Sequence, residues 1–141
     1  RSGLYDRVTA MLREAGKDVF ELSGVMPNPR TEKVYEGIEL CKANGVDFIL
    51  AVGGGSVCDY AKGVSVAAYC DADPWEKYYV RMEPVDNAII PVGCVLTMAG
   101  TGSEMNGGSV ITNHAVKRKI GRVFGDAVFP RFSILDLQRM V

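Results

Sequence analysis

The stretch Asp47-Phe48-Ile49-Leu50-Ala51-Val52-Gly53-Gly54-Gly55-Ser56 decides the fold, because an apolar strand runs directly into a glycine turn. Residues 56–69 then follow with the apolar spacing of a helix. Glycine has no Cβ, so the turn can adopt backbone angles that other residues resist, and a phosphate can approach the main chain closely. The first amides of a helix lack intrahelical partners and carry the positive end of its dipole. The sequence therefore predicts an anion site where this helix begins.

Two named phosphate motifs do not fit this turn. Cys58 stands where the dinucleotide fingerprint needs a third glycine, and no Walker lysine follows at the required spacing. An interpretation without a ligand also stays open. In it the turn is closed by a capping box, with Ser56 as the N-cap and Asp59 three residues later.

Composition narrows the class of protein. The chain has 141 residues, of which 48% are hydrophobic, and 16 Lys and Arg balance 17 Asp and Glu. We therefore expect one domain over residues 1–141 and no nucleic-acid or acidic partner. No segment is apolar for long enough to cross a bilayer and no signal-peptide pattern opens the chain, so we expect a cytoplasmic protein without membrane contact. The four cysteines form no CxxC pair, which favours buried free thiols.

The pattern along the chain alternates between helices and strands. It predicts helices over 1–16, 31–45 and 56–69, and strands over 19–22, 48–52, 88–92, 110–112 and 131–135. Thr31 and Gly45 are the expected N-cap and stop of the second helix, and a polar hinge is expected at 71–74. This order predicts an α/β fold with a Rossmann-like, open, mostly parallel sheet and flanking helices. The strand at 48–52 is apolar throughout, which is typical of a central strand.

A second loop, over residues 97–104, is rich in small and hydroxyl side chains. It follows the strand predicted at 88–92, and the carboxyl ends of parallel strands lie at one edge of a sheet. We therefore expect it to meet the glycine turn there. Two such loops suit a dinucleotide, although an irregular turn without a ligand remains an alternative for the second one.

Two long motifs carry a resemblance. Gly53-Gly54-Gly55-Ser56-x-x-Asp59-x-Ala61-Lys62 and Thr101-Gly102-Ser103-Glu104-Met105-Asn106-Gly107-Gly108 resemble the iron-containing alcohol dehydrogenase family. Pro27-Asn28-Pro29 and Asp73-Pro74-Trp75 extend the match over nearly the whole chain, and Met105-Asn106 resembles the butanol dehydrogenase and aldehyde reductase branch. The resemblance implies an oxidoreductase that uses NAD or NADP and a divalent metal, iron or zinc, to interconvert alcohols with aldehydes or ketones.

The resemblance implies cofactor contacts at six positions, which are Gly54, Gly55, Ser56, Thr97, Thr101 and Lys119. The first three would meet the cofactor pyrophosphate. The two threonines would lie along its adenosine and ribose side, and the lysine would reach a cofactor ribose.

Three further polar residues need an interpretation. Asp59 matches a family aspartate near the nicotinamide and the substrate, so it is the candidate catalytic residue, and its capping role stays open beside that one. Lys62 lies one turn further into the helix, where we expect an ion-pair partner rather than a catalyst. His114 lies among charged residues in a predicted turn, so we expect it to be solvated.

The resemblance also implies that the metal ligands of the family lie outside this chain. The family holds its metal with one aspartate and three histidines on a helical second domain, and this chain contains one histidine. We assign no metal ligand here, and expect that domain and the family's first strand to lie outside the chain. The isolated chain should then bind a dinucleotide weakly and not turn over. The residue that separates NAD from NADP belongs to the loop after that first strand.

One possible assembly and two alternative functions remain at this point. An open sheet edge and the habit of the family are both consistent with a homodimer. A non-catalytic nucleotide-binding or interaction module would need no chemistry at all. A related enzyme such as dehydroquinate synthase or glycerol dehydrogenase is the other alternative, although the run Glu104-Met105-Asn106-Gly107-Gly108 favours the butanol branch.

Overall fold

The structure is a computed structural model that describes residues 3–25, 28–98 and 102–136. Its helices and strands, in chain order, are α1 (Gly3–Glu14), α2 (Thr31–Asn44), β1 (Ile49–Gly53), α3 (Gly55–Ala67), the π-helix η1 (Trp75–Val80), β2 (Val92–Leu96), the 3-10 turn η2 (Ser103–Met105), β3 (Gly108–Asn113), β4 (Arg118–Val123), the 3-10 turn η3 (Asp126–Val128) and β5 (Ser133–Leu135). Across these ranges, every helix is too short or too polar to span a membrane.

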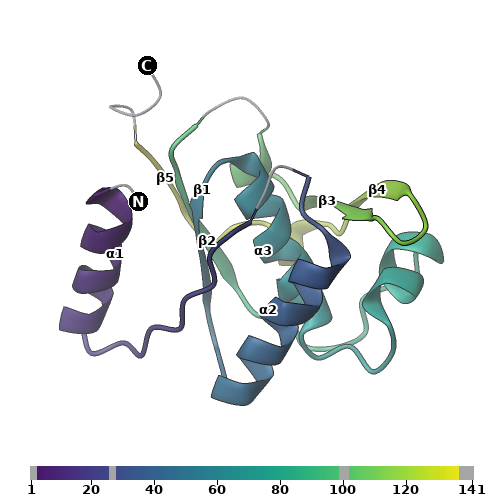
Figure 1. Ribbon diagram of the computed structural model, residues 1–141, viewed down its shortest axis with the longest axis horizontal. Coiled ribbons are helices and arrows are strands. Elements are labelled where there is room, and N and C mark those ends of the chain that lie inside the picture. Colours follow the sequence, from purple (N-terminus) through teal and green to yellow (C-terminus); the bar gives the residue numbers. More distant parts are fainter. Residues whose placement is uncertain (1–2, 26–27, 99–101, 137–141) are drawn as a thin grey trace.

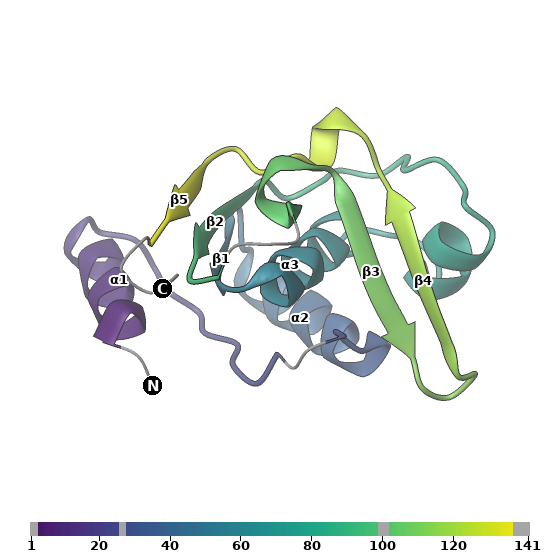
Figure 2. The ribbon, with the colours of Figure 1, turned by 90° about the horizontal axis from the view of Figure 1, so that it is seen from above.

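Three parallel strands, in the order β1-β2-β5, form the main sheet. Helices α2 and α3 lie on one side of this sheet, and α1 lies on the other side (Figure 1). A separate hairpin of β3 and β4 lies beyond α3, so α3 runs between the sheet and the hairpin (Figure 2). This arrangement confirms the predicted α/β class with a Rossmann-like parallel sheet and flanking helices.

Strand β2, not β1, is the centre of the sheet. All five residues of β2 are buried, whereas Ala51 is the one fully buried residue of β1. The predicted central position of residues 48–52 is therefore wrong within the described sheet, where β1 forms an edge. The apolar side chains of β1 are partly covered by Phe20 and Leu22, which line a small groove against it.

Two strand predictions on either side of β1 fail. Residues 19–22 form no strand, because the segment brings apolar side chains toward β1 without pairing its backbone to that strand. The strand expected over 88–92 begins only at Val92. The Ser65 hydroxyl of α3 donates to the Ile90 carbonyl, so Ile90 is bonded to α3. Pro91 has no N–H to donate, and only its carbonyl bonds to the sheet, by accepting from the Ile49 amide at 2.9 Å.

The strand expected at 110–112 exists, but it joins the hairpin rather than the parallel sheet. It is part of β3, which pairs antiparallel with β4 and sets Ile111 opposite Ile120. The sequence conceals β4, because neither face of this strand is apolar throughout: Ile120 lies between Arg118 and Arg122 on one face, and the other carries Lys119, Gly121 and Val123. His114 is exposed in the turn between the two strands, as predicted.

The helix ends test the capping predictions. Helix α2 begins at Thr31 with Arg30 as its N-cap, and α3 begins at Gly55 with Gly54 as its N-cap, so the N-caps predicted at Thr31 and Ser56 are wrong. Neither cap uses a side chain. The stop at Gly45 is confirmed, since its left-handed backbone (φ 59°) lets its N–H donate to the Cys41 carbonyl.

The cysteines are free thiols, as predicted. Cys41, Cys58 and Cys94 are buried, and Cys70 is half-buried. Burial raises the pKa of the Cys41 thiol, and a hydrogen bond to Cys94 raises that of Cys58. Both groups are therefore neutral packing residues at physiological pH.

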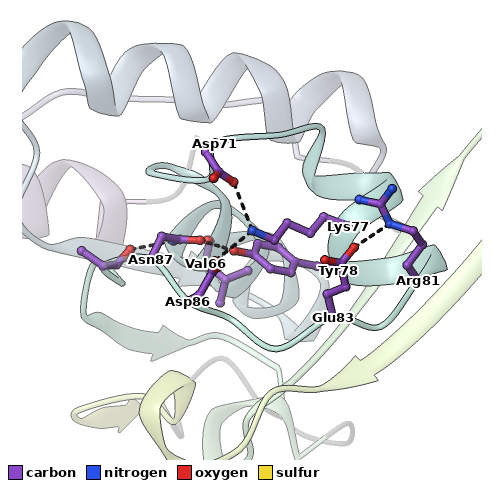
Figure 3. Close-up of polar contacts among 9 residues, drawn as sticks. Val66, Asp71, Lys77, Tyr78, Arg81, Glu83, Asp86 and Asn87 are labelled. Carbon is purple, nitrogen blue, oxygen red and sulfur yellow. Dashed lines mark hydrogen bonds and ion pairs between the residues drawn. The ribbon is translucent and has the colours of Figure 1, made fainter.

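A buried lysine fastens the segment after α3, where the sequence predicts only a polar hinge. The Lys77 ammonium lies 3.1 Å from Asp71 and 2.9 Å from Asp86, with Lys77 between the two carboxylates (Figure 3). The Tyr78 hydroxyl donates to Asn87, whose side-chain amide donates to an α3 carbonyl at 2.9 Å. These contacts attach η1 to the end of α3.

Helices α2 and α3 approach closely at one glycine. A Cβ built at Gly37 would lie 2.5 Å from the Tyr60 hydroxyl oxygen and 2.8 Å from a Val64 methyl group. The Tyr60 hydroxyl donates to the Lys33 carbonyl at 2.5 Å, which holds the tyrosine ring in place. Glycine at this position therefore permits the contact between the two helices.

Gly37→Ala should destabilise the protein by about 1–3 kcal/mol, because the new methyl group would push α2 off α3. The matched control is Gly3→Ala, the same change in α1, where a Cβ meets nothing within 4 Å. In a helix, alanine is favoured over glycine by about 1 kcal/mol, so the control should be neutral or stabilising. Urea unfolding of the two variants measures the difference. Equal stability would contradict the close packing at Gly37.

Candidate functional site

The turn between β1 and α3 has the geometry that the sequence predicts for an anion site. Gly53 has a φ of 151°, which favours glycine, and a Cβ there would lie 2.8 Å from a Val57 methyl group. Gly54 is the extended N-cap, and α3 begins directly after it at Gly55. The first amides of α3 therefore lie at the positive end of a 13-residue helix.

The loop after β2 meets this turn. The parallel register of β1 and β2 ends at the pair Gly53 and Leu96, and the Thr97 amide then donates to the Gly53 carbonyl at 2.9 Å. The prediction that the two loops share one edge of the sheet is confirmed at Thr97. Thr101 lies outside the described residues.

A cleft of about 460 Å³ lies beside the start of α3. Gly55, Ser56 and Asp59 line it from α3, and Lys119 and Arg122 line it from β4. The remaining walls are residues 28–29 and the segment 103–110, which joins η2 to β3. The cleft thus combines helix amides, one carboxylate and two cationic side chains.

Asp59 connects three elements at the wall of the cleft. Its Oδ1 accepts a hydrogen bond from the Ser103 hydroxyl at 2.5 Å, and its Oδ2 accepts one from the Val110 amide at 3.2 Å. Its backbone carbonyl accepts from the Ser109 hydroxyl at 2.8 Å. The predicted capping box is therefore wrong, because this carboxylate binds η2 and β3 instead of its own helix start.

Lys62 is fully buried beneath the same wall. Its ammonium donates to neutral oxygens of one segment, which are the Ser103 carbonyl (2.5 Å), the Ser103 hydroxyl (2.9 Å), the Asn106 side chain (3.0 Å) and the Gly108 carbonyl (3.0 Å). Burial lowers the pKa of Lys62, and the negative charge of Asp59 opposes that shift. The predicted ion pair is wrong, since no ion pair in the described ranges includes Lys62.

Lys119 connects β4 to the segment that precedes α2. Its ammonium donates to the Asn28 side chain at 2.6 Å, and Asn28 has a left-handed backbone (φ 59°). The neighbouring Pro29 carbonyl accepts from the Thr112 amide at 2.8 Å, which fastens this segment along β3. Because Asn28 and Lys119 both line the cleft, their contact holds two of its walls together.

Most of the residues selected from the sequence gather in one place. Gly55, Ser56, Asp59 and Lys119 line the cleft, and Gly54 caps the helix that opens into it. Thr97 is bonded to the turn itself and does not line the cleft. The structure therefore groups these positions, and their individual roles remain predictions.

Among the lining residues with polar side chains, sequence reasoning gave no role to Asn28, Ser103, Asn106, Ser109 and Arg122. Asn28, Ser103 and Asn106 belong to the motifs that carry the family resemblance, so the sequence marked these positions without giving them a role. Nothing in the sequence marked Arg122, because it lies in β4, a strand that was not predicted. Its guanidinium donates to the Tyr78 carbonyl at 2.8 Å and lies 4.8 Å from the Phe124 ring centre, which fixes it at the rim.

The chain is similar to one family over nearly its whole length. Residues 1–137 match the family described as iron-containing alcohol dehydrogenase. The chain belongs to this family. It is 52% identical over 137 residues to the probable NADH-dependent butanol dehydrogenase 1 of Bacillus subtilis (strain 168), an alignment that covers 96% of this chain and 34% of that protein.

Other members of the iron-containing alcohol dehydrogenase family extend the comparison. The NADPH-dependent aldehyde reductase YqhD of Escherichia coli (strain K12) is 40% identical over 139 residues, covering 96% of this chain and 35% of the relative. The crystal structure of NADH-dependent butanol dehydrogenase A from Thermotoga maritima matches with a TM-score of 0.88 at 42% identity, covering 95% of this chain and 33% of that one. The chain thus spans about a third of the length of the curated relatives it matches.

The family name raises the question of metal ligands. Over residues 3–25, 28–98 and 102–136, no group of three or more His, Cys, Asp or Glu side chains could hold a metal ion. The described side chains therefore do not fit a metal centre of this family, and no metal-dependent step is assigned to them. The glycine turn and the cleft, by contrast, fit the phosphates of a dinucleotide.

Asp59→Ala should lower the free energy of unfolding by about 1–3 kcal/mol, because it removes the acceptor for Ser103 and for the Val110 amide. Asp18→Ala is the control at an exposed aspartate and should change stability by less than about 0.5 kcal/mol. Urea unfolding monitored by circular dichroism gives both values. A more stable Asp59→Ala variant would instead mean that the carboxylate is held under strain for function.

Proposed function

We propose that this chain is the dinucleotide-binding part of an NAD(P)-dependent alcohol dehydrogenase or aldehyde reductase. The observation that carries the proposal is the start of α3, where Gly53 and Gly54 open a helix N-terminus into a cleft lined by Ser56 and Asp59. Family membership supports the reaction class, and the relatives include both NADH-dependent and NADPH-dependent enzymes.

The proposed binding mode follows from the positions of the residues. The cofactor pyrophosphate would accept hydrogen bonds from the amides of Gly54, Gly55 and Ser56, with Thr97 on its adenosine side. Lys119 would donate to a ribose hydroxyl after leaving Asn28. Thr101 would also lie along the adenosine and ribose side of the cofactor, a role that rests only on the family resemblance.

The reaction of the whole protein would be hydride transfer between the nicotinamide and a small alcohol or aldehyde. The bound cofactor supplies the hydride chemistry. The residues of this chain would bind and orient it, and Asp59 would present a carboxylate beside the nicotinamide and the substrate. We place the metal-dependent half of the reaction outside the described residues, and propose residues 1–141 as a nucleotide-binding unit of a larger enzyme.

The expected affinity is modest. About three backbone hydrogen bonds to charged oxygens contribute roughly 1.5–3 kcal/mol each. Association itself costs on the order of 4–15 kcal/mol. The chain should therefore bind NADH or NADPH with a micromolar or weaker dissociation constant and show no alcohol oxidation by itself.

Gly55→Val tests the proposal, because a branched side chain at the first residue of α3 would block phosphates from the helix amides. We expect NADH binding, measured by fluorescence titration, to weaken at least about tenfold. Parallel titration with NADPH shows which nicotinamide the protein prefers.

Gly3→Val is the matched control, since Gly3 is also the first residue of a helix and its surroundings are open. It should leave the affinity unchanged. Equal binding by the Gly55→Val and wild-type proteins would remove the glycine turn from the site. A folded wild-type protein that binds neither nucleotide would favour the alternative of an interaction module.

A further inference from the structure

Lys62 is the most unusual polar residue of the fold. Its side chain is fully buried in α3, and its four hydrogen-bond acceptors all belong to the segment 103–108. That segment forms one wall of the cleft, since Ser103, Asn106 and Gly108 line it. One buried charge therefore joins α3 to the whole length of that wall.

The cost of burying this charge points to a specific role. An ammonium group removed from water destabilises the fold unless hydrogen bonds replace its hydration. Lys77, the other buried lysine, faces the carboxylates of Asp71 and Asp86, which raise its pKa (Figure 3). Lys62 instead faces neutral oxygens and its pKa is lowered by burial. An apolar side chain would pack in α3 without this cost, so simple packing does not explain the residue.

The direction of the hydrogen bonds shows what Lys62 orders. An ammonium group can only donate, so the Ser103 hydroxyl oxygen is the acceptor in its bond to Lys62. The hydrogen of that hydroxyl is then available for Asp59, whose Oδ1 lies 2.5 Å away. Lys62 thereby orients the Ser103 hydroxyl toward Asp59. The Asp59 carboxylate accepts this hydrogen bond and is held at the wall of the cleft.

We propose that Lys62 is a positioning residue for the nicotinamide half of the dinucleotide, acting through Ser103 on Asp59 and on the wall 103–108. The proposal rests on the proposed function. The phosphates would lie at Gly55 and Ser56, and Asp59 lies about one helical turn further along α3. A ligand that ends at its phosphates therefore does not need this wall, whereas a ligand that extends past them does.

The test compares two ligands, ADP and NADH, in the protein with Lys62→Met, which keeps an unbranched side chain one atom shorter and removes its charge. NADH affinity should fall by roughly tenfold, since a charged hydrogen-bond network is lost, while ADP affinity should change less than about twofold. Isothermal titration calorimetry measures both dissociation constants. Lys77→Met is the matched control, because it removes a buried ammonium away from the cleft, and it should leave both affinities unchanged.

Ser103→Ala keeps the proposal testable if Lys62→Met does not fold, since it removes only the hydroxyl between Lys62 and Asp59. It should also weaken NADH selectively. Equal losses for ADP and NADH, or no loss, would overturn the positioning role while leaving the proposed function intact. A folded wild-type protein that binds neither ligand would overturn the proposed function and this role together.

Discussion

The packing of α3 between the parallel sheet and the β3–β4 hairpin is the constraint on which the rest of the structure depends (Figure 2). Its N-terminus emerges at the carboxyl edge of β1, so the glycine turn and the cleft are set by one helix. Its buried face carries Asp59 and Lys62, which bond to η2 and to β3. A shift of α3 would therefore displace the phosphate end and the far wall of the cleft together.

The local part of this arrangement could be predicted from the sequence. A strand, a glycine turn and a helix are neighbours along the chain, so residues 47–69 reveal the start of the site without any tertiary information. The same holds for the stop of α2 at Gly45, where a left-handed residue is needed. The family resemblance then added Lys119, which lies 63 to 65 positions from Gly54–Ser56 but lines the same cleft as Gly55 and Ser56.

The rest could not be predicted, because it depends on contacts between distant segments. Ser56 and Asp59 fit the pattern of a capping box, yet the carboxylate is taken by Ser103 and Val110, which are more than forty residues away. Strand β4 carries basic residues on both of its faces, so the alternation of apolar side chains does not reveal its pairing with β3. Lys62 resembles a helix-surface lysine, and only the position of the wall 103–108 shows it to be buried. Sequence patterns describe one element at a time and miss such cross-connections.

The most direct test of this account is to follow the backbone amides by two-dimensional NMR while NADH is added to the protein. The account predicts the largest changes at Gly54–Ser56 and along the segment 103–110, which includes the wall 103–108, since these residues border the proposed ligand on both sides. The groove formed by Phe20, Leu22 and Phe48 should show no change. Changes confined to that groove, or an unchanged spectrum at millimolar NADH, would contradict the claim that α3 opens into a dinucleotide site.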